Sequence, residues 1–273
     1  MDARRPPSIV PRMHWLLLRG LAREQRHWGE FPSVLRARLD GDGVHCLDLP
    51  GTGTEHARQS PASIAAIAED LRRRWLDLRA TRPGPWGLVA ASLGGMVAMS
   101  WCAAWPEDFS RLVLLNTSAG DLSPPWQRLD VRLLPKVLRT LFSADEQRRQ
   151  RSILEMTTQL QPDLAALSRR WARVQGDAPV ARTTVLRQLF AGMRFRVPAR
   201  LGAEVLVLGS DGDRFVSPAC PRKVASHLGA RLEVHPTAGH DLPLDAPEWV
   251  AERIAAWARP ARTSTRGHEA AAS

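Results

Sequence analysis

Short apolar runs alternate with longer amphipathic runs along most of the chain. The apolar runs lie between turn signals at residues 14–20, 43–51, 86–92, 111–118, 204–210 and 231–236. Runs of this length without a polar face are typical of strands in a parallel sheet that helices cover on both sides. The pattern therefore predicts six buried strands.

Helical patterns separate most of these predicted strands. Between the second and third, one apolar stripe at helical spacing consists of Ile64, Ile67, Leu71, Trp75 and Leu78. Ser60 is the candidate cap of this helix, and Pro61 suits its first turn. Residues 93–105 predict a buried helix, and 245–260 predict the last one. Strands that alternate with helices in this way predict an α/β fold with a mostly parallel central sheet flanked by helices.

Residues 119–200 interrupt the alternation, because they contain helical patterns and no convincing strand pattern. We interpret this stretch as a helical cap inserted into a core that residues 12–118 and 201–260 form. Residues 261–273 lack apolar periodicity and are expected to be a disordered tail.

Length and composition are those of a globular protein with one large domain. The chain has 273 residues, of which 44% are hydrophobic and 24% charged. No run approaches the ~20 apolar residues of a membrane span, and the apolar run near the start is too short for a signal peptide. We therefore expect no membrane span and a cytoplasmic location. Cys46, Cys102 and Cys220 are widely spaced and suggest neither a disulfide framework nor a zinc site.

Positive charge is concentrated in the predicted cap. The formal net charge is +10, and residues 121–200 contribute +8 of it, from 15 basic and 7 acidic side chains. A preference for arginine that reflects genomic base composition is one explanation, and a surface for an anionic substrate or an acidic carrier protein is another. The sequence contains no aromatic–basic motif for nucleic acid, so no specific nucleic-acid partner is expected.

Candidate chemistry begins at Ser92 in VAASLGGMVA, where a predicted strand gives way to a predicted helix. Ala90 and Gly94, two residues to either side, are small, as a sharp strand–turn–helix around an exposed serine requires. The usual pattern is G-x-S-x-G, from which Ala90 departs. A serine at this place is also a common helix cap, so the motif alone leaves both interpretations open.

Two more chemical groups follow predicted strands. Asp213 comes after the strand at 204–210, and His240 comes after the strand at 231–236. The carboxyl ends of parallel strands meet at one edge of a sheet, so Ser92, Asp213 and His240 are expected to lie together. Their order along the chain is that of α/β-hydrolases.

The chain resembles an α/β-hydrolase from about residue 12 to 258. The segments that carry the resemblance are RGLAREQRHW, LDLPGTG, AASLGGMVA, PEDFSRLVLLNTS, GSDGDRFVSP and AGHDLPLDAPEWV. The resemblance implies that Ser92 is the nucleophile, His240 the base and Asp213 the acid of a catalytic triad.

The choice of acid and the oxyanion hole need separate arguments. Asp211 is the alternative acid, but Val216 and Pro218 follow Asp213 at the spacing found in the family. The backbone N–H of Leu93, directly after the nucleophile, is one expected oxyanion donor. By resemblance, the second donor is the N–H of Leu21. Arg19 stands where that loop usually has histidine, a departure from the family pattern that still allows a backbone donor.

A serine with histidine and aspartate suits carboxylic esters, thioesters or lactones, without a metal or an organic cofactor. Family members that attack with aspartate or cysteine are excluded by Ser92, and the chain has no tyrosine for epoxide opening. We expect a carboxylesterase-like enzyme that acts on a small-molecule ester. Its layout also resembles esterases of pimeloyl-carrier-protein methyl ester. The alternatives are a lyase on the same triad, of the menaquinone-synthesis type, and a non-catalytic binding protein.

Overall fold

The computed structural model describes residues 13–39 and 43–259. Its centre is a six-stranded sheet in the order β2-β1-β3-β4-β5-β6, in which every neighbouring pair is parallel. The strands are β1 (His14–Leu18), β2 (Gly43–Leu47), β3 (Trp86–Ala91), β4 (Arg111–Leu115), β5 (Glu204–Ser210) and β6 (Arg231–His235). The predicted α/β fold with a parallel central sheet is confirmed. The predicted tail at 261–273 lies outside the described residues.

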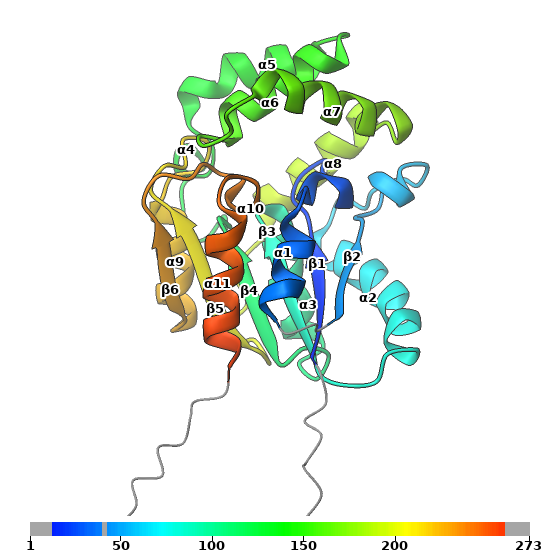
Figure 1. Cartoon of the computed structure of the whole chain (residues 1–273), viewed down its shortest axis with the longest axis vertical. Helices are drawn as coiled ribbons and strands as arrows, with labels where there is room; N and C mark the ends of the chain where they lie inside the picture. Colours follow the sequence, from blue (N-terminus) through cyan, green and yellow to red (C-terminus); the bar gives the residue numbers. More distant parts are fainter. Residues whose placement is uncertain (1–12, 40–42, 260–273) are drawn as a thin grey trace, which may run out of the picture.

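Helices cover both faces of the sheet (Figure 1). One face packs against α2 (Ile64–Ala80), α3 (Leu93–Ala104) and α9 (Ala219–Leu228). The other face packs against α1 (Phe31–Arg38), α10 (Leu242–Asp245) and α11 (Pro247–Ala258). Short 3-10 helices lie at Gln25–Trp28, Gly53–Glu55 and Val131–Leu133.

Both faces of the central strands are buried, which explains their apolar sequences. In β3, Leu88 belongs to one core cluster, and Val89, the next residue, belongs to the other. Leu112 and Val113 of β4 divide in the same way. Side chains alternate across a strand, so a sheet with two covered faces needs apolar residues at every position.

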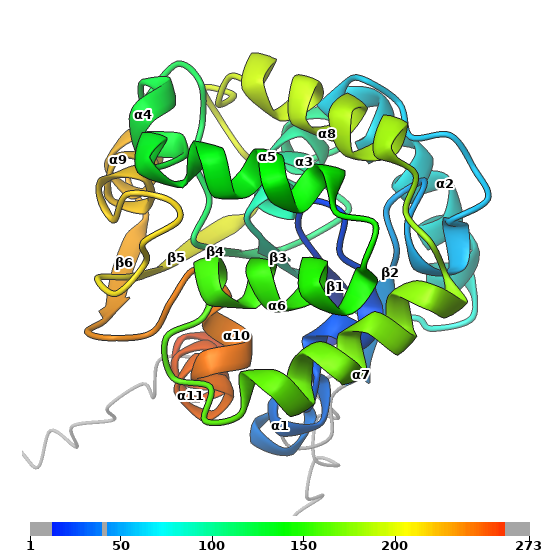
Figure 2. The ribbon, with the colours of Figure 1, turned by 90° about the horizontal axis from the view of Figure 1, so that it is seen from above.

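Residues 119–200 run from β4 to β5 and contain helices but no strand. We call them the helical segment. Its helices are α4 (Pro125–Arg128), α5 (Leu134–Phe142), α6 (Glu146–Thr157), α7 (Leu164–Asp177) and α8 (Arg182–Arg194). They lie over the end of the sheet at which the strands finish (Figure 1), and the view from above shows them spread across it (Figure 2). The division into a core and a cap domain stays a prediction.

The start of α2 was predicted too early. The helix begins at Ile64, with Ser63 at the N-cap position in an extended conformation. Ser60 does not cap the helix, because its hydroxyl donates to the carbonyl of Pro61. The carbonyl of Ser60 instead accepts from Arg187 Nε of α8 at 2.6 Å. Ser60, which was expected to cap α2, therefore makes a contact with the helical segment instead.

The helical segment has an unusually apolar surface. Among the described residues, eleven large hydrophobic side chains are exposed, and all but Leu76 belong to this segment. Four of them recur at helical spacing in α5 and the turn before it, namely Val131, Leu134, Leu138 and Phe142. Several large apolar side chains exposed on one segment are typical of a region that contacts other molecules.

Two further observations concern the chain as a whole. None of the helices between residues 13 and 259 is both long and apolar enough to cross a membrane. All three cysteines carry free thiols; those of Cys102 and Cys220 are buried, and that of Cys46 is partly buried.

Candidate active site

Ser92 lies in a tight turn between β3 and α3. Its φ of 52° is in the left-handed region, which is strained for a residue with a side chain. The Ser92 N–H donates to the Leu115 carbonyl at 2.8 Å, and Thr117 Oγ1 donates to the Ser92 carbonyl at 2.8 Å. Hydrogen bonds from both sides therefore fix the strained turn, and the side chain stays partly exposed.

Gly94 is required by close packing in the same turn. A Cβ atom at this position would lie 2.5 Å from the Arg19 carbonyl oxygen and 2.7 Å from that of Leu18. Only glycine lets the first turn of α3 approach the end of β1 so closely. The second small residue predicted around Ser92, Ala90, is fully buried in β3.

The structure brings together the three residues that were predicted to meet. His240 Nε2 lies 3.0 Å from Ser92 Oγ, and His240 Nδ1 lies 2.7 Å from Asp213 Oδ2. The other carboxylate oxygen of Asp213 accepts from the N–H groups of Phe215 and Val216 at 2.9 and 2.8 Å. Because a carboxylate only accepts, the imidazole proton belongs on Nδ1, and Nε2 is free to accept from the serine hydroxyl.

Charge around the histidine favours its protonated form. Burial lowers the pKa of His240, but the charge of Asp213 and its hydrogen bond outweigh burial, so the pKa lies above its usual value of 6.5. Asp241 raises it further and Arg19 opposes. The ring is therefore a stronger base than a free imidazole.

Asp211, the alternative acid, lies elsewhere. Its carboxylate is half exposed and accepts from Arg222 at 2.8 Å on the surface. Its backbone N–H donates to the His235 carbonyl. The geometry thus favours Asp213 over Asp211 as the partner of His240.

Asn116 also contributes to the site, and the sequence analysis did not identify it. Its side-chain amide donates to the carbonyls of Gly239 and His240 at 3.1 and 3.0 Å, and its φ is 43°. The loop that carries His240 is therefore tied to the end of β4. Asparagine directly after a strand tolerates the left-handed conformation, and this is the signal that could have identified it.

The two predicted oxyanion donors belong to the serine turn and to the loop beside it. Leu93 is the first residue of α3, and N–H groups in a first helical turn have no partner within the helix. Leu21 follows Gly20, and a Cβ atom placed on Gly20 would lie 3.6 Å from Ser92 Oγ. The turn at Gly20 is closed by the Arg23 N–H, which donates to the Gly20 carbonyl at 3.2 Å. This loop therefore runs beside the serine.

Arg19 has a partner that the sequence analysis missed. Its guanidinium makes a two-pronged ion pair with Asp241, at 2.9 and 2.6 Å, and both side chains are buried. The ring of Trp28 lies 4.7 Å from the guanidinium. Burial raises the pKa of Asp241, but Arg19 outweighs it and holds the pKa below its usual value. Because Asp241 directly follows His240, this pair joins the loop after β1 to the loop of the base.

The helical segment is attached to the His240 loop. The Asp241 N–H donates to the Thr157 carbonyl at the end of α6, at 2.8 Å. One carboxylate oxygen of Asp245 accepts from the N–H of Gln159 and from the N–H of Gly239, both at 2.7 Å. The end of α6 thus belongs to the structure that holds the histidine.

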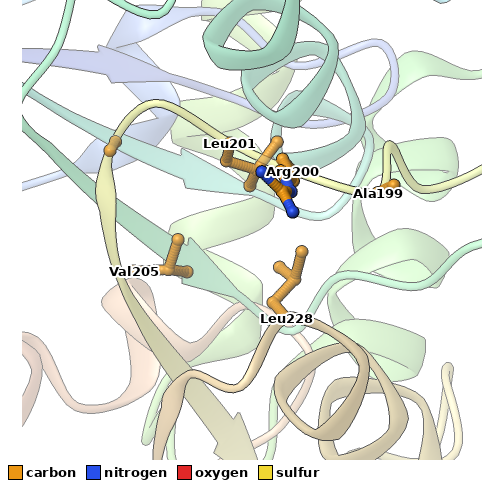
Figure 3. Close-up of a pocket in the computed structure, with 6 residues that line it drawn as sticks. Ala199, Arg200, Leu201, Val205 and Leu228 are labelled. Atoms are coloured by element: carbon orange, nitrogen blue, oxygen red, sulfur yellow. The ribbon is translucent and has the colours of Figure 1, made fainter.

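Two surface cavities lie away from these residues. One of about 240 Å³ is found near the start of β5 and is lined by Ala199, Arg200, Leu201, Ala203, Val205 and Leu228 (Figure 3). A second, of about 320 Å³, lies between α2, α3 and the end of α8. Neither includes a residue of the Ser92–His240–Asp213 set. Within residues 13–39 and 43–259, no three His, Cys, Asp or Glu side chains are grouped to hold a metal ion.

Two characterised proteins are similar to part of the chain. The pimeloyl-[acyl-carrier protein] methyl ester esterase of Chromobacterium violaceum is 36% identical over 92 residues, which are 34% of this chain and 33% of the esterase. The biotin biosynthesis bifunctional protein of Teredinibacter turnerae is 30% identical over 104 residues, which are 38% of this chain and 17% of that protein. The matched regions thus span a third or less of each relative.

Solved structures share the fold over most of the chain. The 2-hydroxy-6-oxo-6-phenylhexa-2,4-dienoate hydrolase of Rhodococcus sp. superposes with a TM-score of 0.71 at 21% identity, over 89% of both chains. An esterase of Thermogutta terrifontis gives a TM-score of 0.66 at 21% identity, over 90% of this chain and 89% of the other. At such identities the likeness concerns the fold.

The family model for alpha/beta hydrolases matches residues 15–253, which include β2 to β6 and all of β1 except its first residue. This range also contains the serine turn and the loops of Asp213 and His240. The chain belongs to the alpha/beta hydrolase family.

Proposed function

We propose that this protein is a serine hydrolase that cleaves carboxylic esters through an acyl-enzyme. The observation that carries the proposal is the continuous hydrogen-bonded chain from Ser92 Oγ through His240 to Asp213, at 3.0 and 2.7 Å. A serine hydroxyl is a weak nucleophile at neutral pH and needs a base within hydrogen-bond reach. His240 is positioned to be that base, and the Asp213 carboxylate orients it.

In the first half of the reaction, Ser92 Oγ forms a bond to the ester carbonyl carbon and gives its proton to His240 Nε2. Asp213 stabilises the imidazolium that results, without taking the proton itself. When the tetrahedral intermediate collapses, the bond to the alkoxy group breaks, and Nε2–H protonates the departing oxygen. The acyl group remains on Ser92.

Negative charge develops on the carbonyl oxygen during both halves of the reaction. We assign its stabilisation to the N–H groups of Leu93, directly after the serine, and of Leu21, in the loop beside it. In the second half, water gives a proton to His240 Nε2 and attacks the acyl carbon. The acid is released as the proton returns to Ser92 Oγ. No step requires a metal or an organic cofactor.

The likeness to a pimeloyl-carrier-protein methyl ester esterase favours a more specific substrate, an ester held on an acidic carrier protein. The +8 charge of residues 121–200 supports the same idea, because an acidic carrier would be attracted to a basic surface over the site. In this view the helical segment acts as the cap through which the substrate enters.

Two measurements separate this function from its alternatives. A p-nitrophenyl ester should give a burst of p-nitrophenol that equals the enzyme concentration, followed by a slower steady rate. A lyase that uses the same residues would give no acyl-enzyme burst, and a binding protein without activity would not react with a fluorophosphonate probe. A probe adduct on Ser92, absent in Ser92→Ala, is the expected result.

A further inference from the structure

Among the described residues, one buried arginine beside the candidate active site has no acidic partner. Arg23 is 9% exposed, and it forms no ion pair within 4 Å in the described part of the chain. Its side chain donates from Nη1 to Gln150 Oε1 of α6, at 2.6 Å, and makes no other hydrogen bond to the part of the chain that the structure describes. Gln150 is held in turn by donating to Glu146 Oε1 at 2.8 Å. A buried guanidinium with only a neutral contact is costly unless an anion reaches it.

The charge balance around Arg23 is positive. Arg19 and Asp241 neutralise each other in their ion pair, so the charge of Arg23 remains. Burial, together with repulsion by Arg19, lowers the pKa of Arg23 to about 10, while Asp241 and Glu146 oppose this. Burial and the two arginines also keep the pKa of His27 well below its usual value, so His27 adds no charge. Glu146 is itself paired with Arg149, so one positive charge remains in surplus.

The position of Arg23 relates this charge to the proposed reaction. Arg23 closes the turn of the loop that carries Gly20 and Leu21, and this loop runs beside Ser92. Its contact Gln150 lies in α6, the same helix whose end holds the His240 loop. The side chain of Arg23 therefore links the proposed oxyanion loop to α6 of the helical segment.

The free edge of the guanidinium indicates which anion it suits. Because Gln150 takes Nη1, the edge formed by Nε and Nη2 makes no hydrogen bond to the described protein groups. This edge offers two parallel donors that match the two oxygens of a carboxylate. Elsewhere in the same protein, Arg72 holds the carboxylate of Asp108 with these two nitrogens, at 2.6 and 3.3 Å. One carboxylate would also neutralise the single surplus charge.

We propose that Arg23 binds a carboxylate of the substrate, so that the preferred substrates are esters that carry a second, ionised carboxyl group. Half-esters of dicarboxylic acids are the simplest members of this class. The inference rests on the proposed ester hydrolysis for the placement of the substrate, but the binding of the carboxylate needs no catalysis. It can therefore be tested in a protein that cannot turn over.

The test measures Kd by calorimetry in a Ser92→Ala background. The ligands are monomethyl esters of dicarboxylic acids of graded chain length and the matched, neutral dimethyl esters. Adding Arg23→Gln should weaken the best half-ester about 10- to 100-fold and leave the dimethyl ester unchanged, because one charge-assisted pair of hydrogen bonds is lost. The half-ester Kd of Arg23→Lys should fall between those of the Ser92→Ala parent and of Arg23→Gln, since lysine keeps the charge without the two parallel donors.

Arg38→Gln is the matched control, because it also removes one positive charge. Arg38, in α1, forms an exposed ion pair with Glu252 in α11. The control should leave both affinities unchanged. The proposal is overturned if Arg23→Gln weakens both ligands equally, if it weakens neither, or if no half-ester binds more tightly than its dimethyl ester. Unchanged melting temperature and unchanged dimethyl-ester binding show that the variant is folded. Turnover that survives Ser92→Ala would refute the proposed function and leave the binding comparison interpretable.

Discussion

The end of the sheet and the helical segment above it are built by different rules. At the sheet end, Ser92, Asp213 and His240 each follow a strand, and hydrogen bonds from nearby backbone or side-chain groups fix each of them. In the helical segment, charges are mostly basic, and ten of the eleven exposed large hydrophobic side chains of the described residues are found there. The first region is organised by hydrogen bonds at the strand ends, whereas the second carries exposed apolar side chains and surplus positive charge.

The strongest test of this contrast is removal of the serine hydroxyl. Ser92→Ala should lower kcat on an activated ester about 10⁴-fold or more, because the nucleophile is lost while the turn and its hydrogen bonds to the backbone remain. Steady-state kinetics and thermal unfolding measure the two effects separately. Near-normal turnover by a folded variant would falsify the assignment of the nucleophile.

The acid comes next in size. Asp213→Asn should lower kcat about 10³- to 10⁴-fold, because the amide no longer fixes the imidazole proton on Nδ1. Asp211→Asn serves as its control and should stay within about twofold, since that carboxylate lies on the surface beside Arg222. The opposite ranking of the two variants would transfer the role of the acid to Asp211.

The pH profile tests the electrostatics of the same region. His240 must be neutral to accept a proton, so activity falls as the pH drops below its pKa, about tenfold per unit. Because that pKa is raised, the half-maximal point should lie above 6.5. In Asp213→Asn the residual activity should have its half-maximal point at lower pH, since the charge that raises the pKa is gone. An acid limb that stays in place would contradict this cause.

Charge in the helical segment should act more weakly. Arg169, Arg170 and Arg173 are exposed in α7, and changing all three to glutamate should lower kcat/KM for an anionic ester about three- to tenfold at low salt. The effect should fade at physiological salt, where exposed charges are screened beyond about 8 Å. A neutral ester of the same size is the control. Identical behaviour of both esters at every salt concentration would mean that these arginines are merely a solvated helix face.

The smallest effect is expected for the exposed apolar surface. Phe142→Ser, at a side chain that is 66% exposed, should change the free energy of unfolding by no more than about 0.5 kcal/mol. The comparison variant is Leu114→Ala in β4, which is fully buried and should cost about 2–5 kcal/mol. Denaturant titration measures both. A large loss at Phe142 would show that the surface of α5 contributes to packing.

The same contrast explains what the sequence could predict. Strand ends such as those before Ser92 and Asp213 are evident from local apolar runs, and the parallel sheet then brings the chemical groups together. The start of α2 was misplaced because Ser60 is engaged by Arg187, a residue far along the chain. The Arg23–Gln150 contact joins residues 127 positions apart, and no local pattern encodes it. Long-range contacts of the helical segment are therefore what the sequence left open.

The attachment of α6 to the loop of His240 has an evolutionary consequence. The Thr157 carbonyl accepts from the Asp241 N–H and the Gln159 N–H donates to Asp245, so the helical segment helps to hold the general base that we propose. A segment attached in this way cannot be replaced as a unit without disturbing the loop that carries His240. Chimeras that graft another helical segment onto this sheet should keep residues 157–159 and their partners, and specificity can then diverge in α5, α7 and α8.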